Sequence, residues 1–206
     1  MHRPLVLAAA SLAVIATGFG TLALASPRSA PVAAPVALAA TPFKVDAVHS
    51  AVLYKVKHMN VSYSYGRFND VSGTFLLDAE DPSASAIDVT IKTESVDSGN
   101  GDRDKHLRSQ DFFSAKEFPT IGFKSSAVRK TASGAFEVDG TLSLRGQSKP
   151  ITATVESTGT GPGMRGGEMA GMHTTFTIKR SDFGMSFMVG PIGDEVTMTV
   201  SLEGGR

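Results

Sequence analysis

Apolar and polar residues alternate with a period of two in many short runs from Phe43 onward. Glycine, aspartate and asparagine gather between these runs, where turns are expected. The pattern predicts strands that bury one face and expose the other. Because the strands do not alternate with helical patterns, the predicted sheet is antiparallel. The clearest runs are 52–57, 87–92, 136–144, 151–156, 173–179 and 195–202.

Further strands within 65–77 and 119–129 bring the predicted number to about eight. A sheet with one apolar face must hide that face, either in a sandwich of two sheets or in a closed barrel. The periodicity leaves both architectures open, and both are all-β. An eight-stranded barrel has an interior that side chains just fill, or that holds one small ligand.

One stretch, 101–123, interrupts the alternation with charges of both signs, a histidine and four phenylalanines. Asp102 is a good N-cap for a helix, and Asp104 would follow where the helix dipole favours an anion. Pro119 prevents a helix from continuing beyond it. The stretch therefore predicts one short helix near Asp102–Gln110, covering one end of the β-structure.

The N-terminal residues have the composition of an export signal. His2 and Arg3 precede an uncharged run, Pro4–Pro27, which is rich in alanine, leucine and valine. Ala23-Leu24-Ala25 offers a small-x-small cleavage pattern, which predicts a signal peptide over 1–25, cleavage near Ala25, and a periplasmic or secreted protein. The run is long enough to span a bilayer, so an uncleaved anchor is the alternative. Ala37-Leu38-Ala39 offers a second cleavage site.

Residues 26–42 are rich in alanine and proline and nearly uncharged, which predicts an extended linker before a single domain at 43–206. Lysine plus arginine and aspartate plus glutamate number 20 each, so no electrostatic footprint for nucleic acid is present. The chain has no cysteine, which excludes a disulfide scaffold, a cysteine nucleophile and a cysteine-linked lipid anchor.

Six groups of residues, in order along about Phe43–Glu203, resemble motifs of the YceI-like family, which comprises secreted bacterial lipocalin-like barrels that bind polyisoprenoids. The groups are Asp46-x-x-His49-Ser50, Gly66-Arg67-Phe68 with Gly73-Thr74-Phe75, Arg103-Asp104-Lys105-His106-Leu107 with Asp111-Phe112-Phe113, Phe118-Pro119-x-Ile121-x-Phe123, Gly140-x-Leu142-x-Leu144-Arg145-Gly146-x-x-Lys149-Pro150, and Ile178-x-Arg180-Ser181-Asp182-Phe183-Gly184. The resemblance implies an eight-stranded antiparallel lipocalin-like barrel with one short helix. It also implies a polyprenyl diphosphate, polyprenol or isoprenoid quinone as ligand, with no other cofactor.

The apolar faces of the predicted strands would line a tunnel suited to an alkyl or isoprenyl chain. For the aromatic residues, ordinary core packing is the alternative. The candidate lining residues are Val52, Tyr54, Val56, Phe68, Phe75, Ile87, Val89, Ile91, Phe112, Phe113, Phe123, Phe176 and Phe183.

Four polar residues within the family-like motifs are candidates to bind a ligand head group: Arg103, Asp104, His106 and Arg180. A guanidinium can hold a diphosphate through charge-assisted hydrogen bonds. Two alternatives remain open. The arginines could belong to a solvated rim paired with Asp102, Asp104 and Asp182, or the Arg103–Asp104 region could only fasten the helix across the barrel end.

No catalytic residue and no metal site are predicted. The histidines His49, His58, His106 and His173 are scattered without ligand spacing. The alternatives to a lipid carrier are an enzyme with hydrolase-type chemistry at the Asp104/His106 mouth, with Asp111 nearby, and an accessory that presents a quinone for electron transfer. A carrier would need transient membrane contact for loading.

Six glycines fall within Gly159–Gly171, and no lysine of a phosphate-binding loop accompanies them. This segment is predicted to be either a mobile flap over the ligand mouth or a plain hairpin connection. A tryptophan often found before the last motif in YceI-like proteins is absent here, and Gly161-Pro162-Gly163-Met164-Arg165 stands in its place.

Overall fold

Eleven strands form one antiparallel sheet in the part of the chain that the computed structural model describes, residues 41–164 and 166–206. The strands are β1 (Phe43–Val45), β2 (Ala51–His58), β3 (Ser62–Phe68), β4 (Val71–Leu76), β5 (Ala86–Lys92), β6 (Val96–Asp97), β7 (Thr120–Lys130), β8 (Phe136–Leu144), β9 (Gln147–Pro162), β10 (Glu168–Lys179) and β11 (Ile192–Gly205). All belong to one compact unit, Leu38–Arg206. The predicted signal peptide, both cleavage sites and the linker up to residue 40 lie outside the described residues.

The sheet closes into a barrel because β1 pairs with β11 as well as with β4. Three barrel strands are each broken into two segments, namely β1 with β2, β3 with β4, and β5 with β6. Both β1 and β2 pair with β11, while β3 pairs with β2 and β4 pairs with β1. Eight strands therefore surround the interior, and the predicted eight-stranded antiparallel barrel with one short helix is confirmed.

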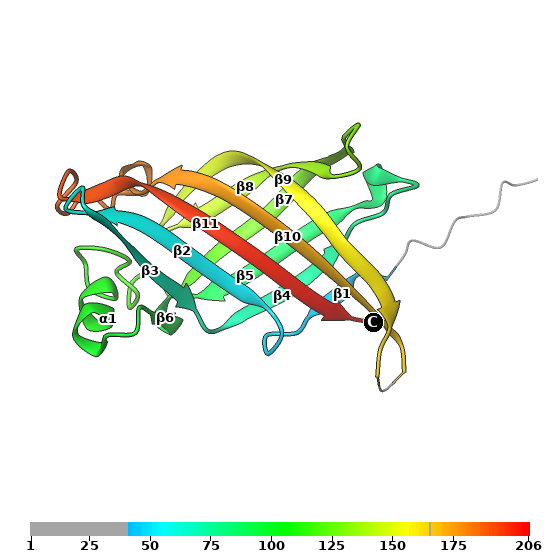
Figure 1. Ribbon diagram of the computed structural model, residues 1–206, viewed down its shortest axis with the longest axis horizontal. Helices are drawn as coiled ribbons and strands as arrows, with labels where there is room; N and C mark the ends of the chain where they lie inside the picture. Colours follow the sequence, from blue (N-terminus) through cyan, green and yellow to red (C-terminus); the bar gives the residue numbers. More distant parts are fainter. Residues whose placement is uncertain (1–40, 165) are drawn as a thin grey trace, which may run out of the picture. The chain divides into compact units, whose positions relative to one another are not determined.

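The α-helix, α1 (Gly101–Leu107), lies at one end of the barrel (Figure 1). Its N-cap is Asn100, whose side-chain oxygen accepts a hydrogen bond from the Arg103 amide at 3.0 Å. The prediction of Asp102 as the cap was wrong, because Asn100 adopts the extended conformation of a cap while Asp102 is already helical.

Short 3-10 turns are η1 (Pro82–Ala84), η2 (Thr93–Ser95) and η3 (Arg180–Phe183). None of the helices in the described part of the chain has the length and hydrophobicity that a bilayer-spanning helix needs.

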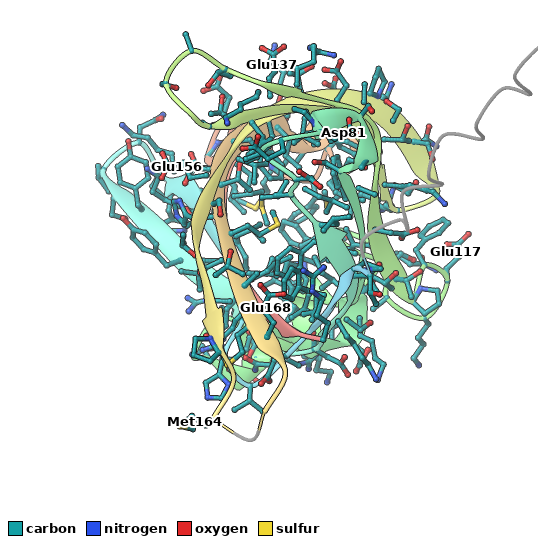
Figure 2. The ribbon with its side chains drawn as sticks, turned by 90° about the vertical axis from the view of Figure 1, so that its right-hand side faces the viewer. Asp81, Glu117, Glu137, Glu156, Met164 and Glu168 are labelled. Atoms are coloured by element: carbon teal, nitrogen blue, oxygen red, sulfur yellow. The ribbon has the colours of Figure 1, made fainter. Side chains whose placement is uncertain are left out.

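The two ends of the barrel differ. The end that carries α1 also carries the β2–β3 turn and the segment between η3 and β11, and is called the α1 end (Figure 1). The opposite end, called the far end, carries the β4–β5, β7–β8 and β9–β10 connections (Figure 2). The glycine-rich segment 159–171 is a plain hairpin of β9 and β10 at the far end, away from α1.

The far half of the barrel is packed solid. Its buried side chains come from the inward positions of β1, β4, β7 and β8, and are Phe43, Val45, Phe75, Leu76, Val128, Phe136 and Val138. Close packing of this kind supplies most of the favourable free energy of a β-barrel through the removal of apolar surface from water. The half nearer α1 is not filled in this way.

Candidate functional site: an apolar cavity with a polar mouth

A cavity of about 480 Å³ occupies the barrel interior toward the α1 end. This volume lies within the range of about 300–1,000 Å³ that is usual for small-molecule sites. The inward residues of the strands form its wall, as the period of two requires. The wall includes eleven of the predicted lining residues, namely Val52, Tyr54, Val56, Phe68, Ile87, Val89, Ile91, Phe112, Phe113, Phe123 and Phe176.

Two predicted lining residues do not reach this cavity. Phe75 belongs to the solid far half, where its ring stacks on that of Phe43 with 5.8 Å between ring centres. Phe183 lies on η3 and is buried in the core beside the cavity wall. Alternation shows that Phe75 points inward but not its height along the barrel axis. Phe183 lies in a 3-10 turn, where the period of two does not apply.

The wall also contains residues that were not selected from the sequence, although they belong to strands with clear alternation. These are mostly on β8 to β11 and include Leu142, Ile151, Val155, Met172, Ile178, Val196, Met198, Val200 and Leu202. The same signal could have found them. Two glycines on the strands make room for aromatic rings of the wall, because a Cβ atom at Gly66 would clash with Tyr54 and one at Gly140 would clash with Phe123.

Arg103 stands at the mouth of the cavity, where its side chain is exposed and also forms part of the wall. Its Nε atom donates to the Ser98 hydroxyl and its Nη2 atom donates to the Ser98 carbonyl, both at 2.7 Å. These bonds fix the guanidinium in place. Among the described residues no hydrogen-bond partner faces Nη1, so this atom is able to bind a ligand.

Asp104, in contrast, faces away from the cavity. Its carboxylate accepts a hydrogen bond from the Ser98 amide at 2.7 Å and a second one from the Ser98 hydroxyl. The side chain is buried and does not line the wall. Asp104 therefore fastens α1 to the preceding turn, which is the second of the two roles considered for this region.

Arg180 is 3% exposed and lines the inner side of the mouth. It donates to the carbonyls of Gly193 at 2.9 Å, Met185 at 2.7 Å and Ile192 at 3.0 Å. The predicted alternative of a solvated rim paired with carboxylates was wrong for Arg180, because its nitrogen atoms bind backbone oxygen instead. Burial lowers the pKa of Arg180, and the nearby Asp194 carboxylate partly offsets this effect.

His106 forms a pair with Asp111, not with Asp104. Its Nε2 atom lies 2.8 Å from the Asp111 carboxylate, and its ring makes edge contacts with Phe112 and Phe187. The imidazole lines the mouth and is partly exposed. Any acid–base chemistry at this mouth would therefore use His106 and Asp111, and within the described residues the only side-chain hydrogen bond of His106 is to Asp111.

Tyr54 adds a polar atom to the wall just inside the mouth. Burial raises the pKa of Tyr54 to about 12, while the charge of Arg103 opposes this rise. The phenol is therefore neutral at physiological pH, and its hydroxyl can donate a hydrogen bond.

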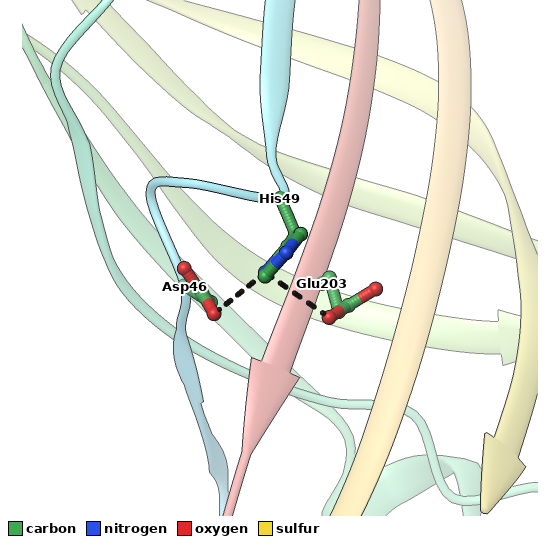
Figure 3. A group of neighbouring side chains, drawn as sticks. All are labelled: Asp46, His49 and Glu203. Atoms are coloured by element: carbon green, nitrogen blue, oxygen red, sulfur yellow. Dashed lines mark hydrogen bonds and ion pairs between the residues drawn. The ribbon is translucent and has the colours of Figure 1, made fainter. Parts of the chain in front are cut away.

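A separate polar group lies on the barrel surface, where the segment before β2 meets β11. Figure 3 shows His49 between Asp46 and Glu203. The His49 Nδ1 atom is 2.9 Å from the Asp46 carboxylate and 3.6 Å from that of Glu203. One atom from each group lies within 4.8 Å of the others, which is a set that a divalent cation can bind, although the 2.9 Å contact is a hydrogen bond. Sequence reasoning missed this group because Glu203 is remote from the other two along the chain.

Histidines do not gather into a metal centre anywhere in residues 41–164 and 166–206. The group above is the one cluster of three potential metal-binding side chains found there, and it holds a single histidine. His58 and His106 both line the mouth of the cavity, whereas His173 points outward from β10.

A closed eight-stranded barrel with an apolar cavity at one end is a lipocalin-like barrel. The sequence profile of the YceI-like domain matches residues 43–204, and the chain belongs to the YceI-like family. It is 40% identical over 188 residues to a UPF0312 protein of Pseudomonas aeruginosa, and the aligned region covers 90% of this chain and 97% of that protein. A UPF0312 protein of Shewanella baltica is 38% identical over 84% of this chain and 92% of its own.

Solved structures have the same fold. The YceI protein of Campylobacter jejuni is 32% identical, with a TM-score of 0.65 over 74% of this chain and 90% of that one. BcnA of Burkholderia cenocepacia is 26% identical, with a TM-score of 0.70 over 77% of this chain and 98% of that one. A polyisoprenoid binding domain from Saccharophagus degradans, implicated in plant cell wall breakdown, shares the fold at 15% identity and a TM-score of 0.63 over 80% of this chain and 98% of that one.

Proposed function

We propose that the protein binds an amphiphilic lipid of the polyisoprenoid class and carries or sequesters it. The observation that carries this proposal is the distribution of polar atoms around the cavity. The deep wall is apolar except for Thr174, whose hydroxyl donates to the Thr154 carbonyl at 2.7 Å and is thus already satisfied. The other polar side chains are gathered toward the mouth, and are Tyr54, His58, Ser64, Arg103, His106 and Arg180. Such a wall matches a ligand with a long apolar chain and one polar end.

The family supports the same class of ligand. The chain belongs to the YceI-like family, and one protein with the same fold is a polyisoprenoid binding domain. We further propose that the chain is exported to the periplasm or secreted, on the strength of the charged start, apolar run and Ala23-Leu24-Ala25 pattern of its N-terminus.

In this proposal the head group lies at Arg103 and His106, while the isoprenyl chain extends toward β8–β11. Arg103 is held by Ser98 through Nε and Nη2, which leaves Nη1 to donate to the ligand, and His106 is oriented by Asp111. A polyprenyl phosphate or diphosphate would contact both residues, and a polyprenol or isoprenoid quinone would rely more on the wall. The charge on Arg103 is the feature that separates these ligands.

The test is mass spectrometry of the protein purified from a periplasmic extract, which reports the processed N-terminus and the extracted lipid in one sample. We expect a chain that begins at Ser26 or Ala40 and an isoprenoid in the organic extract. Added polyprenol should then raise the melting temperature of the emptied protein by mass action.

Ile91→Asp tests whether the cavity is where polyprenol binds. Ile91 lines the cavity, and a carboxylate there would disfavour an apolar chain. Thr90→Asp adds the same charge to the outward face of β5 and serves as the control. We expect polyprenol to stabilise the control but not the Ile91 variant, with circular dichroism used to show that both keep a β spectrum.

No thermal shift in the wild type, and no apolar compound in the extract, would contradict the proposal. Turnover of a lipid that is lost in His106→Gln would instead favour an enzyme, and an extracted quinone would favour the electron-transfer alternative.

A further inference from the structure

The β2–β3 hairpin presents a basic surface that the cavity does not use. Residues 51–68 contain Lys55, Lys57, His58 and Arg67 but no aspartate or glutamate. Neither Lys55 nor Lys57 forms an ion pair with any described residue. A segment with one sign of charge and no internal compensation attracts a negatively charged partner.

Aromatic rings accompany these lysines on the outer face. The inward side chains of β2 line the cavity, so Lys55 and Lys57 point outward, and their cross-strand partners are Tyr65 and Tyr63. The Nζ atom of Lys55 lies 5.0 Å from the centre of the Tyr63 ring, and that of Lys57 lies 5.6 Å from it. Both tyrosine rings are exposed. Exposed tyrosines beside lysines are typical of segments that lie at a membrane–water interface.

The tip of the hairpin is apolar and joins a second apolar loop. Val61 is 85% exposed and Met59 is 54% exposed. The Met59 amide donates to the Pro191 carbonyl at 2.6 Å, which ties the tip to the loop between η3 and β11 (Figure 1). That loop exposes residues 187–189. We call the combined surface the lip; it comprises Lys55, Lys57, Met59, Val61, Tyr63, Tyr65, Phe187, Met188 and Val189.

We propose that the lip docks on the surface of a bilayer that contains anionic lipids. Val61, Met59 and residues 187–189 would enter the boundary between head groups and acyl chains, the tyrosines would lie at the head-group level, and the two lysines would contact phosphates. The hairpin thus has an apolar tip followed by paired lysines and tyrosines, which matches the change from acyl chains to head groups across a bilayer interface.

Docking of the lip would place the cavity mouth on the membrane, because the same loops supply His58, Ser64, Phe187 and Met188 to the cavity wall. The purpose of docking rests on the proposed lipid-binding function, since a lipid could then pass between bilayer and cavity without crossing water. The contact itself rests on the composition and exposure of the lip.

Charge elsewhere on the barrel favours this orientation. The β4–β5 connection at the far end contains Asp78, Glu80 and Asp81 (Asp81 is labelled in Figure 2), none of which forms an ion pair with a described residue, and an anionic surface repels them. Glu137 and Glu168, at the same end, are paired with Arg129 and Arg206. Near the lip, the acidic residues of β11 have neighbours of their own: Glu195 lies opposite Lys179 in the sheet, and Asp194 accepts hydrogen bonds from the amide and hydroxyl of Ser181.

The competing occupant is a strand of another protein or of a second copy. In β3 only Arg67 and Phe68 pair with β6, so among the described strands Ser62–Gly66 pairs with β2 alone. Such an edge can accept a further strand. The membrane is favoured because the exposed apolar side chains of Val61 and Met59 lie in the turn beyond the edge and not along it.

The test uses the segment Leu38–Arg206, which contains every strand of the barrel and lacks the apolar run 4–27 that would bind vesicles by itself. Co-sedimentation is measured with vesicles of phosphatidylcholine alone and of phosphatidylcholine and phosphatidylglycerol in equal parts. We expect binding to the anionic vesicles that weakens at high salt. Lys55→Gln with Lys57→Gln should lower it about thirtyfold, because each lysine near an anionic surface contributes about fivefold. Met59→Ser with Val61→Ser should lower it about tenfold or more.

The control pair is Lys44→Gln with Met164→Ser. It removes from the far end one lysine, which pairs with Gly205 at the end of β11, and one exposed methionine (Figure 2), and it should leave vesicle binding unchanged. Absence of vesicle binding by the unaltered protein, or an equal loss in the control, would overturn the proposal. So would lip variants that retain vesicle binding but lose a dimer seen by light scattering, since this result assigns the lip to a second copy. The thermal shift by polyprenol without vesicles is measured in parallel. The lip variants should still be stabilised by polyprenol. If polyprenol stabilises neither the unaltered protein nor any variant, the proposed lipid binding is contradicted, while the vesicle result still decides membrane docking.

Discussion

Arginine side chains at the two ends of the barrel have different partners. At the α1 end, Arg180 donates to three backbone carbonyls, Arg145 donates to those of Gly184 and Gln110, and Arg108 to those of Glu94 and Val96. At the far end, Arg129 donates to the carboxylates of Glu137 and Asp139, and Arg206 donates to the Glu168 carboxylate and to one backbone carbonyl, that of Thr41.

The difference follows from the backbone at each end. Paired strands satisfy their own carbonyl groups, and the far end consists of short connections between paired strands. The α1 end includes two longer irregular segments, 98–119 and 180–191, and the start of β11, where the pairing with β2 is interrupted between Ile192 and Val196. Carbonyls there lack the regular partners that a strand supplies. A guanidinium has five donors in a rigid plane and can satisfy several such carbonyls at once. The mouth of the cavity is therefore held by arginine, while the far end is held by the sheet and the packed core.

The sharpest test of this comparison is Arg180→Met against Arg129→Met. Loss of Arg180 leaves three carbonyls without their donor, one of them in a buried bond, and we expect unfolding free energy to fall by about 3 kcal/mol. Loss of Arg129 removes an exposed ion pair and should cost about 0–1 kcal/mol. Urea denaturation measures both. Equal losses would show that the two ends do not differ in the way described.

A second test concerns ligand affinity. Arg103→Gln removes the charge at the mouth but keeps a side chain that can still contact Ser98. We expect affinity for a polyprenyl phosphate to fall by about 1.5–3 kcal/mol, because a hydrogen bond to a charged group is lost. Affinity for the corresponding alcohol should barely change, and Arg129→Gln should alter neither. Isothermal titration gives the values; an equal loss for both ligands, together with a lower melting temperature, would mean that Arg103 only fastens α1.

The smallest effect is expected at the ion pair of His49. The hydrogen bond to Asp46, assisted by the charges of Asp46 and Glu203, raises the pKa of His49, and the hydrogen bond to His49 lowers the pKa of Asp46. The contribution of the raised histidine is fully present below its unfolded pKa of about 6.5 and is lost as pH rises through the folded value. The contribution of the lowered carboxylate is present above about 3.8 and is lost as pH falls through the folded value.

His49→Gln should therefore reduce stability most near pH 5 and least above about pH 8. His173→Gln, on the outer face of β10, provides the control, since His173 has no ion-pair partner among the described residues. Melting temperatures across this pH range would show the difference. A His49 variant whose deficit is constant with pH would mean that the pair has no electrostatic part.

Most of the barrel could be predicted from the sequence because a period of two is a direct consequence of strand geometry. The inward positions of β2, β5 and β10 were assigned correctly, and they form part of the cavity wall. The height of a residue along the barrel axis has no such signature. Phe75 and Ile87 are both inward, and they face each other across β4 and β5, yet only Ile87 borders the cavity.

The polar mouth was harder to predict because its bonds run from side chains to backbone atoms. Spacing located Arg103, Asp104, His106 and Arg180 near one another, but it could not show that Asp104 turns back to Ser98 while Arg180 binds carbonyls beyond η3. The partner of His106 illustrates the same limit. Asp111 and Asp104 are both close in sequence, and only the fold selects Asp111.

The pairing of β1 with β11 has a consequence for how the barrel forms. Lys44 pairs with Gly205, so the contact that closes the cylinder joins residues near opposite ends of the described chain. Such a long-range contact is entropically costly and forms slowly compared with the hairpins between neighbouring strands. Until β11 has paired, the partly formed sheet has two unpaired edges that can join other chains. The pairing of this strand of the barrel therefore ends the exposure to aggregation.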